Sequence, residues 1–373
     1  MQEFPAPLRR SLAAHGSGLT VLVLRLGAMG DIVRTLPAVR LLRFGLPDAR
    51  VHWVAWEAWT PLLRGHAEID EVVAIPRSEW RGMARAPGRW TDLAAAARGL
   101  VAALRAAAPG LVLDFHGDLR SGLLGRLSAA PVRLGYSGHQ QKEGNRLFTT
   151  HRVPPGPRRR SRIDRNLELV RALGLPVDPM PDAGIPIGPV DERAAAGVLS
   201  ASEVRSAYAV LNAGASRRQA YKKPPPGLLA EAARAAAGAG LVPLVVHGPG
   251  EEDDARAVVE ASRGVARSAG ATGLLALAAL LRGARLFVGG DSGPLHLACG
   301  VGCPVVGLYG PTDPAVNAPW RVPSASVAPE GRAYTGIKAR DRRSGGFEGI
   351  GEDEVARAVE SVLAVPSIVE GLE

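Results

Sequence analysis

Residues 286–313 read LFVGGDSGPLHLACGVGCPVVGLYGPTD and contain two short apolar runs on either side of a glycine-rich turn. The runs, residues 286–288 and 305–309, are mostly aliphatic, which favours parallel strands covered on both faces. Between them, residues 289–294 form a turn into a short helix that Asp291 or Ser292 can cap. The unpaired N–H groups at such a helix start suit an anion, above all a phosphate, although α/β proteins also use glycine-rich turns without a ligand.

The same succession of strand, turn and helix recurs along the rest of the chain. Strands are predicted at residues 19–24, 51–56, 72–75, 111–115, 208–211 and 242–246, and helices at residues 32–44, 91–107, 163–173, 227–237, 274–281 and 352–363. This regular alternation predicts an α/β protein with doubly wound parallel sheets. The proline-rich residues 175–189 separate two similar halves, which predicts domains over residues 1–185 and 186–345. The last segment, residues 346–373, is expected to form a helix that packs back on the first domain.

Length and composition indicate a globular protein. The chain has 373 residues, 46% of them hydrophobic, and no apolar run approaches the length of a membrane-spanning helix. Arg9 and Arg10 followed by the apolar residues 19–24 resemble a signal peptide, but Arg25 ends that run too early. The only two cysteines, Cys299 and Cys303, fit a reducing compartment, and a cytoplasmic protein is therefore expected. Their helical spacing with His296 could suggest zinc, but small core-packing residues are the favoured interpretation.

The positive charge is concentrated in the first half. Residues 1–185 hold 26 Lys and Arg against 16 Asp and Glu, whereas residues 186–373 hold 19 against 20. The first half is therefore expected to meet an anionic partner, either a nucleic acid or an anionic glycolipid at a membrane surface. Residues 135–165 are the most basic segment, which could clamp an anionic acceptor or form a solvated loop.

Four turns hold the candidate site residues. Asp31 follows the first strand, where its carboxylate could cap the next helix or face the edge of the sheet at which open α/β folds bind ligands. In the second half, Ser216 with Lys222 and the turn at Asp291 suit a diphosphate. The carboxylates of Glu251 and Glu252 suit ribose hydroxyls. The alternatives are a solvated lysine and two glutamates that favour a helix start through its dipole.

Seven segments of the chain are similar to one protein family. They are RLGAMGDIVRTLPAVRLLR (25–43), LDFHGDLRSGLLGRL (113–127), LGYSG with QKEGNRLF (134–138 and 141–148), IDRNLELVRALG (163–174), LNAGAS with YKKPP (211–216 and 221–225), VVHGPGEED (245–253) and GGDSGPLHLACGVGCPVVGLYGPTDP (289–314). In sequence and in order the chain resembles the bacterial lipopolysaccharide heptosyltransferases of glycosyltransferase family 9. The segments span nearly the whole chain, and the first and last are the most specific.

The resemblance implies a GT-B architecture, with two Rossmann-like domains facing across a cleft. The first domain would bind the acceptor, a lipid A precursor carrying Kdo at the cytoplasmic face of the inner membrane, and the second would bind the donor ADP-heptose. Asp31 would be the general base of an inverting transfer. No cofactor or metal is implied, and no Asp-x-Asp pair occurs in the sequence. The expected donor-binding residues are Ser216, Lys222, Glu251, Glu252, Asp291, Ser292, Gly293 and His296, and the expected acceptor-binding residues are Arg25, Arg120, Lys142 and Arg146.

Several alternatives stay open on the sequence. Lys223 could replace Lys222 at the diphosphate, because the residues around this pair depart from the family pattern. Either Glu251 or Glu252 could bind the ribose. The chain could use another nucleotide sugar or another acceptor. An NAD-dependent dehydrogenase is disfavoured because residues 27–30 lack the full G-x-G-x-x-G, and a nucleic-acid-binding protein is disfavoured because no recognition module is present.

Overall fold

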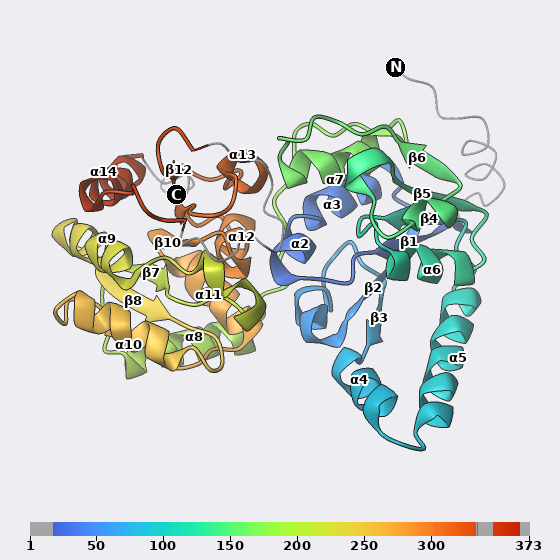
Figure 1. The fold of residues 1–373 in the computed structure, drawn as a ribbon, viewed down its shortest axis with the longest axis horizontal. Coiled ribbons are helices and arrows are strands. Elements are labelled where there is room, and N and C mark those ends of the chain that lie inside the picture. The colour runs from blue at the N-terminus through green and yellow to red at the C-terminus, as the bar shows by residue number, and fades with distance from the viewer. Residues whose placement is uncertain (1–17, 333, 335–345, 366–373) are drawn as a thin grey trace. The chain divides into compact units, whose positions relative to one another are not determined.

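The computed structural model describes residues 18–332, 334 and 346–365, and the chain divides into two compact units at Pro186 and Ile187. The first unit is one α/β domain built on a parallel six-stranded sheet (Figure 1). Its strand order is β3-β2-β1-β4-β5-β6. The strands are β1 (Thr20–Leu24), β2 (Arg50–Trp56), β3 (Glu71–Ile75), β4 (Leu111–Asp114), β5 (Val132–Tyr136) and β6 (His151–Val153). The strand β1 is buried throughout, as its continuous apolar sequence predicts.

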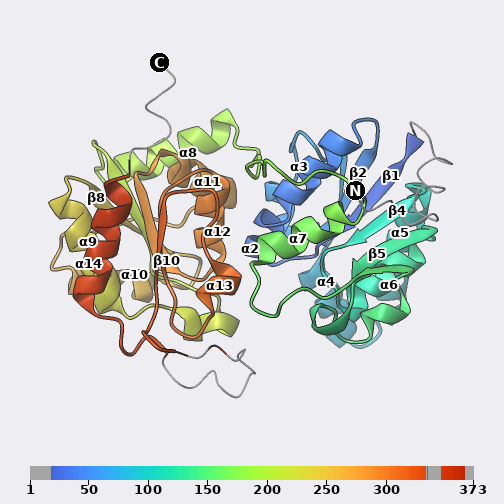
Figure 2. The same cartoon turned by 90° about the horizontal axis from the view of Figure 1, so that it is seen from above.

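Helices cover both faces of this sheet (Figure 2). They are α2 (Met29–Val33), α3 (Leu36–Gly45), α4 (Arg77–Arg85), α5 (Trp90–Ala106), α6 (Leu119–Leu127) and α7 (Arg162–Arg171). Leu104 of α5 packs with Leu22 and Leu24 of β1 in one apolar cluster, while α3 packs against α7. The single helix predicted over residues 32–44 is wrong, because the chain breaks between α2 and α3. Pro37 lies in the first turn of α3, where its missing N–H is tolerated.

The second unit repeats this topology. Its parallel sheet has the order β12-β11-β10-β7-β8-β9, with strands β7 (Tyr208–Asn212), β8 (Val242–Val246), β9 (Arg267–Ser268), β10 (Leu286–Gly290), β11 (Val305–Leu308) and β12 (Ser324–Val327). The helices are α8 (Pro189–Ala201), α9 (Pro226–Gly238), α10 (Glu252–Ala261), α11 (Leu274–Gly283), α12 (Gly293–Gly300), α13 (Pro314–Asn317) and α14 (Glu352–Leu363). When the strands are renumbered within each unit, both sheets have the order 3-2-1-4-5-6 that defines the Rossmann fold. The predicted pair of doubly wound, Rossmann-like domains is confirmed.

The last helix belongs to the second domain. The apolar face of α14 is buried in the core of that domain. Val355, Val359 and Val362 lie at helical spacing and join the cluster formed by α9, α10 and the sheet. Helix α14 therefore completes the second domain. No helix in the described part of the chain is both long and apolar enough to cross a membrane.

Candidate active site

The strand order places a ligand-binding crevice in each domain. In an open α/β sheet, ligands bind at the carboxyl ends of the strands, at the point where the strand order reverses. That point lies between β1 and β4 in the first domain and between β7 and β10 in the second. Asp31 follows β1, and Lys222 and Asp291 follow β7 and β10. The sequence candidates therefore gather at the two reversal points.

Asp31 lies inside α2 and does not cap it. The N-cap position belongs to Ala28, whose carbonyl accepts from the Asp31 N–H at 3.0 Å. Gly27, before the helix, has a φ of +154°, and a Cβ there would lie 2.6 Å from Nε1 of Trp59. The turn therefore requires glycine, and it leaves the Asp31 side chain on the first turn of the helix, directed at cations rather than at backbone.

Three arginines contact one oxygen of Asp31. Oδ1 lies 2.8 Å from Nη2 of Arg34, 2.9 Å from Nη2 of Arg25 and 3.1 Å from Nη1 of Arg162. Burial of this carboxyl acts to raise its pKa, but the guanidinium groups of Arg25, Arg162 and Arg34 outweigh burial and hold the pKa well below its usual range. The described residues donate no hydrogen bond to Oδ2. Asp31 is therefore ionised at neutral pH, with one oxygen available to accept a proton.

Backbone contacts hold these arginines in place. Arg34 Nε donates to the Gly30 carbonyl at 3.1 Å, and Arg25 also donates to the Phe115 carbonyl at the end of β4. Asn166 of α7 donates to the Arg34 carbonyl at 2.8 Å, which fixes the helix that carries Arg162. The side chains of Arg25 and Arg34 are only 12% and 6% exposed, whereas that of Arg162 is 41% exposed. Arg162 is therefore the member of this cluster most accessible to a ligand.

The turn after β4 holds a second cluster of polar side chains, centred on Asp118. Asp118 caps α6 by accepting from the N–H groups of Arg120 and Ser121, each at 3.0 Å, and its Oδ2 also lies 3.3 Å from Nε2 of His116. Partial burial acts to raise the pKa of Asp118, but the hydrogen bonds from His116 and from the Ser121 N–H lower it well below its usual range. Arg120, a predicted acceptor-binding residue, is tied to Asp118 by its guanidinium.

The other two predicted acceptor-binding residues, Lys142 and Arg146, lie on an exposed loop. No contact with Asp31 is found for either side chain among the described residues. The structure therefore brings together Asp31 and Arg25 of the predicted acceptor site, but does not join Lys142 and Arg146 to them.

In the second domain, Lys222 is fixed beside Asp291. Its ammonium donates to the Asp291 carbonyl at 3.1 Å and to Oδ2 at 3.0 Å, and His296 lies 3.3 Å from the other carboxylate oxygen. Asp291 and His296 are almost fully buried. An ammonium group has three donors, and the contacts with Asp291 use two of them, so among the described residues one N–H of Lys222 remains for a further acceptor. Lys223 points elsewhere, to an ion pair with Asp254 on α10.

The start of α12 lies beside this ion pair. Ser292 is the N-cap residue, and its hydroxyl accepts from Asn212 Nδ2 at 3.3 Å. Gly293 is the first residue of the helix and is partly exposed. Ser216, predicted to bind the donor, is exposed after β7. The start of α12 offers helix N–H donors next to the Asp291 that holds the Lys222 ammonium, an arrangement that suits a diphosphate.

Glu251 and Glu252 differ in position. Oε2 of Glu251 accepts from the Gly248 N–H at 2.9 Å and covers Gly214, where a Cβ would lie only 1.7 Å from that oxygen. Gly214 therefore makes room for this carboxylate at the carboxyl end of β7. Glu252 is exposed, and hydrogen bonds from its own N–H and from that of Gly250 lower its pKa. Of the two, Glu251 is the one held at the reversal point.

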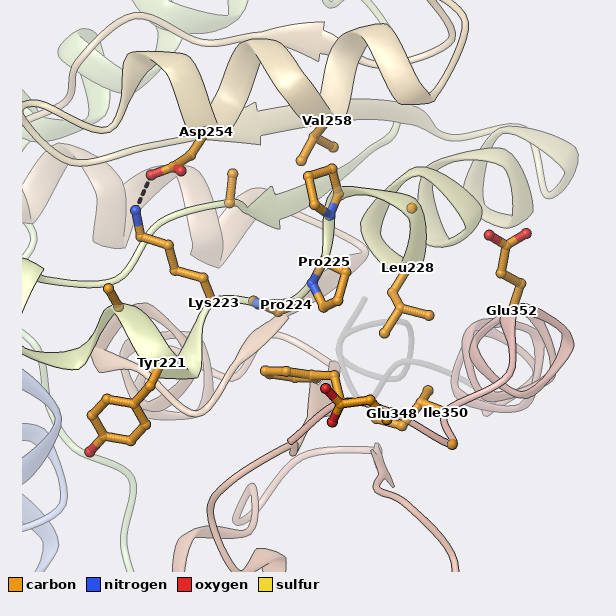
Figure 3. A pocket seen from close by; sticks show the side chains of 16 residues that line it. Tyr221, Lys223, Pro224, Pro225, Leu228, Asp254, Val258, Glu348, Ile350 and Glu352 are labelled. Carbon is orange, nitrogen blue, oxygen red and sulfur yellow. Dashed lines mark hydrogen bonds and ion pairs between the residues drawn. The ribbon is translucent and has the colours of Figure 1, made fainter. Parts of the chain in front are cut away.

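A cavity of about 600 Å³ lies on the second domain (Figure 3). Its lining includes Pro224, Pro225 and Pro226, and the ion pair of Lys223 with Asp254 lies at one end. None of the predicted donor-binding residues is among the residues that line it. Tyr221 and Lys223, the residues on either side of Lys222, do line it, so the cavity adjoins the segment that carries Lys222.

Sequence reasoning missed two partners of Asp31. Arg34 follows it by three residues, a helical spacing that could have indicated the contact. Arg162 was only one of many cations in the basic segment, and no local signal ties it to a residue 131 positions away. The interpretation of His296, Cys299 and Cys303 as core residues agrees with their burial. Among the described residues, no group of three His, Cys, Asp or Glu side chains could hold a metal ion.

Comparison with known proteins gives the family. The model of glycosyltransferase family 9 (heptosyltransferase) matches residues 97–335. Lipopolysaccharide heptosyltransferase 3 of Escherichia coli K12 is 27% identical over 297 residues, covering 78% of this chain and 82% of the relative. A family 9 glycosyltransferase of Veillonella parvula superposes with a TM-score of 0.75 at 21% identity, over 92% of this chain and 97% of the other. The E. coli heptosyltransferase WaaC, solved with ADP, gives 0.70 at 22% identity, over 92% and 100%. The chain therefore has the GT-B fold and belongs to glycosyltransferase family 9, the heptosyltransferases.

Proposed function

We propose that this glycosyltransferase moves a heptose from ADP-heptose to an anionic inner-core acceptor of lipopolysaccharide, with inversion and with Asp31 as general base. Family membership and the curated relatives support the coarser function, a heptosyltransferase of lipopolysaccharide core biosynthesis. The observation that carries the finer proposal is the asymmetric environment of Asp31, with three arginines on Oδ1 and no hydrogen bond to Oδ2 among the described residues.

The arginines suit an anionic acceptor. A guanidinium group forms paired hydrogen bonds with carboxylates and phosphates, and Arg162 is accessible enough to make them. Kdo carries a carboxylate, so a Kdo-containing acceptor would place a negative charge beside this cluster. The same contact would take part of the positive charge away from Asp31 and make it a stronger base. We assign Arg25 and Arg162 to acceptor binding on this ground.

The second domain would hold the donor. One N–H of Lys222 and the start of α12 would bind the diphosphate, while Glu251 would accept from the ribose hydroxyls. Asp291 and His296 would orient the lysine. The complex of WaaC with ADP supports an adenine nucleotide as the leaving group.

The reaction then needs three changes of bonding. The acceptor hydroxyl oxygen bonds to the anomeric carbon from the face opposite the diphosphate, and the bond from that carbon to the diphosphate breaks. The hydroxyl proton passes to Oδ2 of Asp31. The negative charge that develops on the diphosphate is stabilised by Lys222 and the N–H groups of α12. The proposal includes no metal and no cofactor.

A product assay tests this function. The protein would be given ADP-heptose with a Kdo-containing acceptor, and the product would be read by mass spectrometry and NMR. We expect the mass of one heptose to be added, with inversion at the anomeric carbon. Transfer from ADP-glucose but never from ADP-heptose would leave the family unchanged and refute the donor. The proposal also places the protein at the cytoplasmic face of the inner membrane, since the acceptor is anchored there.

A further inference from the structure

Two exposed leucines lie on the outer face of α6. Leu119 and Leu123 are 45% and 44% exposed. They are four residues apart, so they lie one above the other on the same side of the helix. Exposed leucines in neighbouring turns form an apolar strip that the rest of the described chain does not cover.

A neighbouring loop adds a third leucine. Leu147, in the short helix Asn145–Leu147, is 76% exposed. Asn145 Nδ2 donates to the Asp118 carbonyl at 2.8 Å, and a Cβ on Gly122 of α6 would lie 2.9 Å from the Phe148 ring. The loop is thus packed along α6 and holds Leu147 beside it. We call Leu119, Leu123 and Leu147 the leucine patch.

Exposed cations lie on the same elements as the leucine patch and on the strand next to them. Exposed basic side chains on α6 and on the adjoining loop and strand are Arg120, Arg126, Lys142, Arg146 and Arg152. Two carboxylates lie among them, Asp118, which is already paired with Arg120, and the exposed Glu143. Exposed leucines together with exposed cations match a bilayer that contains anionic lipids, which takes up leucine side chains and attracts Lys and Arg.

We propose that the leucine patch docks the first domain on the surface of an anionic lipid bilayer. The inference rests on the proposed function in one respect, because a lipid-anchored acceptor brings the enzyme to such a surface. Helix α6 starts at the carboxyl edge of the sheet, the edge at which Asp31 also lies, and Arg25 bonds to the Phe115 carbonyl just before that start. A bilayer seated on the patch would therefore present an acceptor headgroup close to Asp31.

Vesicle binding tests the docking surface. The full chain would be sedimented with vesicles of phosphatidylcholine alone and of an equal mixture with phosphatidylglycerol. We expect binding to the mixed vesicles only, weakened by salt. Each exposed leucine changed to serine should weaken binding by about tenfold, since a buried leucine contributes about 1.5 kcal/mol or more. Phe44→Ser is the matched control, because Phe44 is 64% exposed on α3, away from the patch, and this variant should bind as the unchanged protein does.

The outcomes separate this proposal from the proposed function. Unchanged binding of Leu119→Ser, Leu123→Ser and Leu147→Ser, or an equal loss with Phe44→Ser, would overturn the patch as the docking surface. Melting temperatures equal to that of the unchanged protein would show that the variants are folded. With a water-soluble, delipidated acceptor the leucine variants should keep full transfer, and they should lose it only with acceptor embedded in vesicles. Failure of the unchanged protein to use any Kdo acceptor would refute the function, while vesicle binding would still report on the patch.

Discussion

Replacement of Asp31 by asparagine tests the catalytic proposal most directly. The side chain keeps its size, and its amide oxygen can still accept from the arginines that now contact Oδ1. What is lost is the negative charge and the ability of Oδ2 to take a proton. General base catalysis contributes about 10²- to 10⁴-fold, which corresponds to about 3 to 5 kcal/mol of the activation barrier. We therefore expect kcat to fall by about that factor.

The acceptor KM should respond differently from kcat. Without the carboxylate, Arg25, Arg34 and Arg162 lose their common partner and become better ligands for an anionic acceptor. The KM for the acceptor should therefore stay the same or fall. The pKa of Asp31 in the free enzyme is held well below its usual range, so kcat/KM for the acceptor should show no loss from protonation of Asp31 between about pH 8 and about pH 5.

Steady-state rates measured by ADP release would check both expectations, with urea unfolding as the test of folding. Asp164→Asn is the matched control, because Asp164 lies on the same helix as Arg162 but is exposed, and it should change kcat by less than about twofold. A folded Asp31→Asn enzyme that kept more than about a tenth of kcat would refute the assignment of the base. A raised KM with unchanged kcat would instead make Asp31 a binding residue.

Three further predictions concern the other contacts. Lys222→Met should lower kcat/KM for the donor by about 10²-fold or more, whereas Lys223→Met, which breaks a separate ion pair, should lower it by less than about tenfold, as initial rates would show. Gly214→Ala should weaken ADP binding in calorimetry, because its Cβ collides with the carboxylate that covers this glycine; Gly197→Ala, where nothing lies within 4 Å, should not. Asp118→Ala should lower the free energy of unfolding by about 1 kcal/mol at neutral pH through loss of the α6 cap. Because the folded pKa of Asp118 is lowered, this stabilisation is present above the unfolded pKa and lost in acid, so urea unfolding should give a smaller difference below about pH 3.

Continuous apolar runs predicted most of the strands, including β3 at the edge of the first sheet, whereas β5, which is mostly buried, was missed. β1 and β10 are continuous apolar runs, and every residue in them is buried. β6 and β9 were missed because they are edge strands of three and two residues with polar, partly exposed side chains. β12, with the sequence SASV, offered equally little apolar signal. A short edge strand forms because it pairs with a neighbouring strand, and the hydrophobic pattern of its own sequence does not show which strand that is.

Helix boundaries failed where two elements share one periodic pattern. Residues 32–44 keep their apolar spacing through the break between α2 and α3, so periodicity alone predicted one helix. The same limit explains why a helix cap was one of the two roles left open for Asp31. The N-cap is Ala28, and the helix starts at Met29. Asp31 therefore lies in the first turn of the helix and not at its cap. A shift of three residues changes the role of this carboxylate from a backbone partner to a partner of distant arginines.

The candidate site could be predicted in kind but not in its pairing. Each reversal point holds charged side chains in contact, with the signs of the central and surrounding charges exchanged between the two domains. In the first domain a carboxylate is surrounded by guanidinium groups, and in the second a lysine is held by the buried carboxylate of Asp291. In both domains a charged group of the substrate could bind beside the protein carboxylate. Arg162 is accessible in the first domain, and Lys222 has a donor left over from its described contacts in the second. The acceptor then competes with Asp31 for the arginines, which ties the strength of the base to the presence of its substrate.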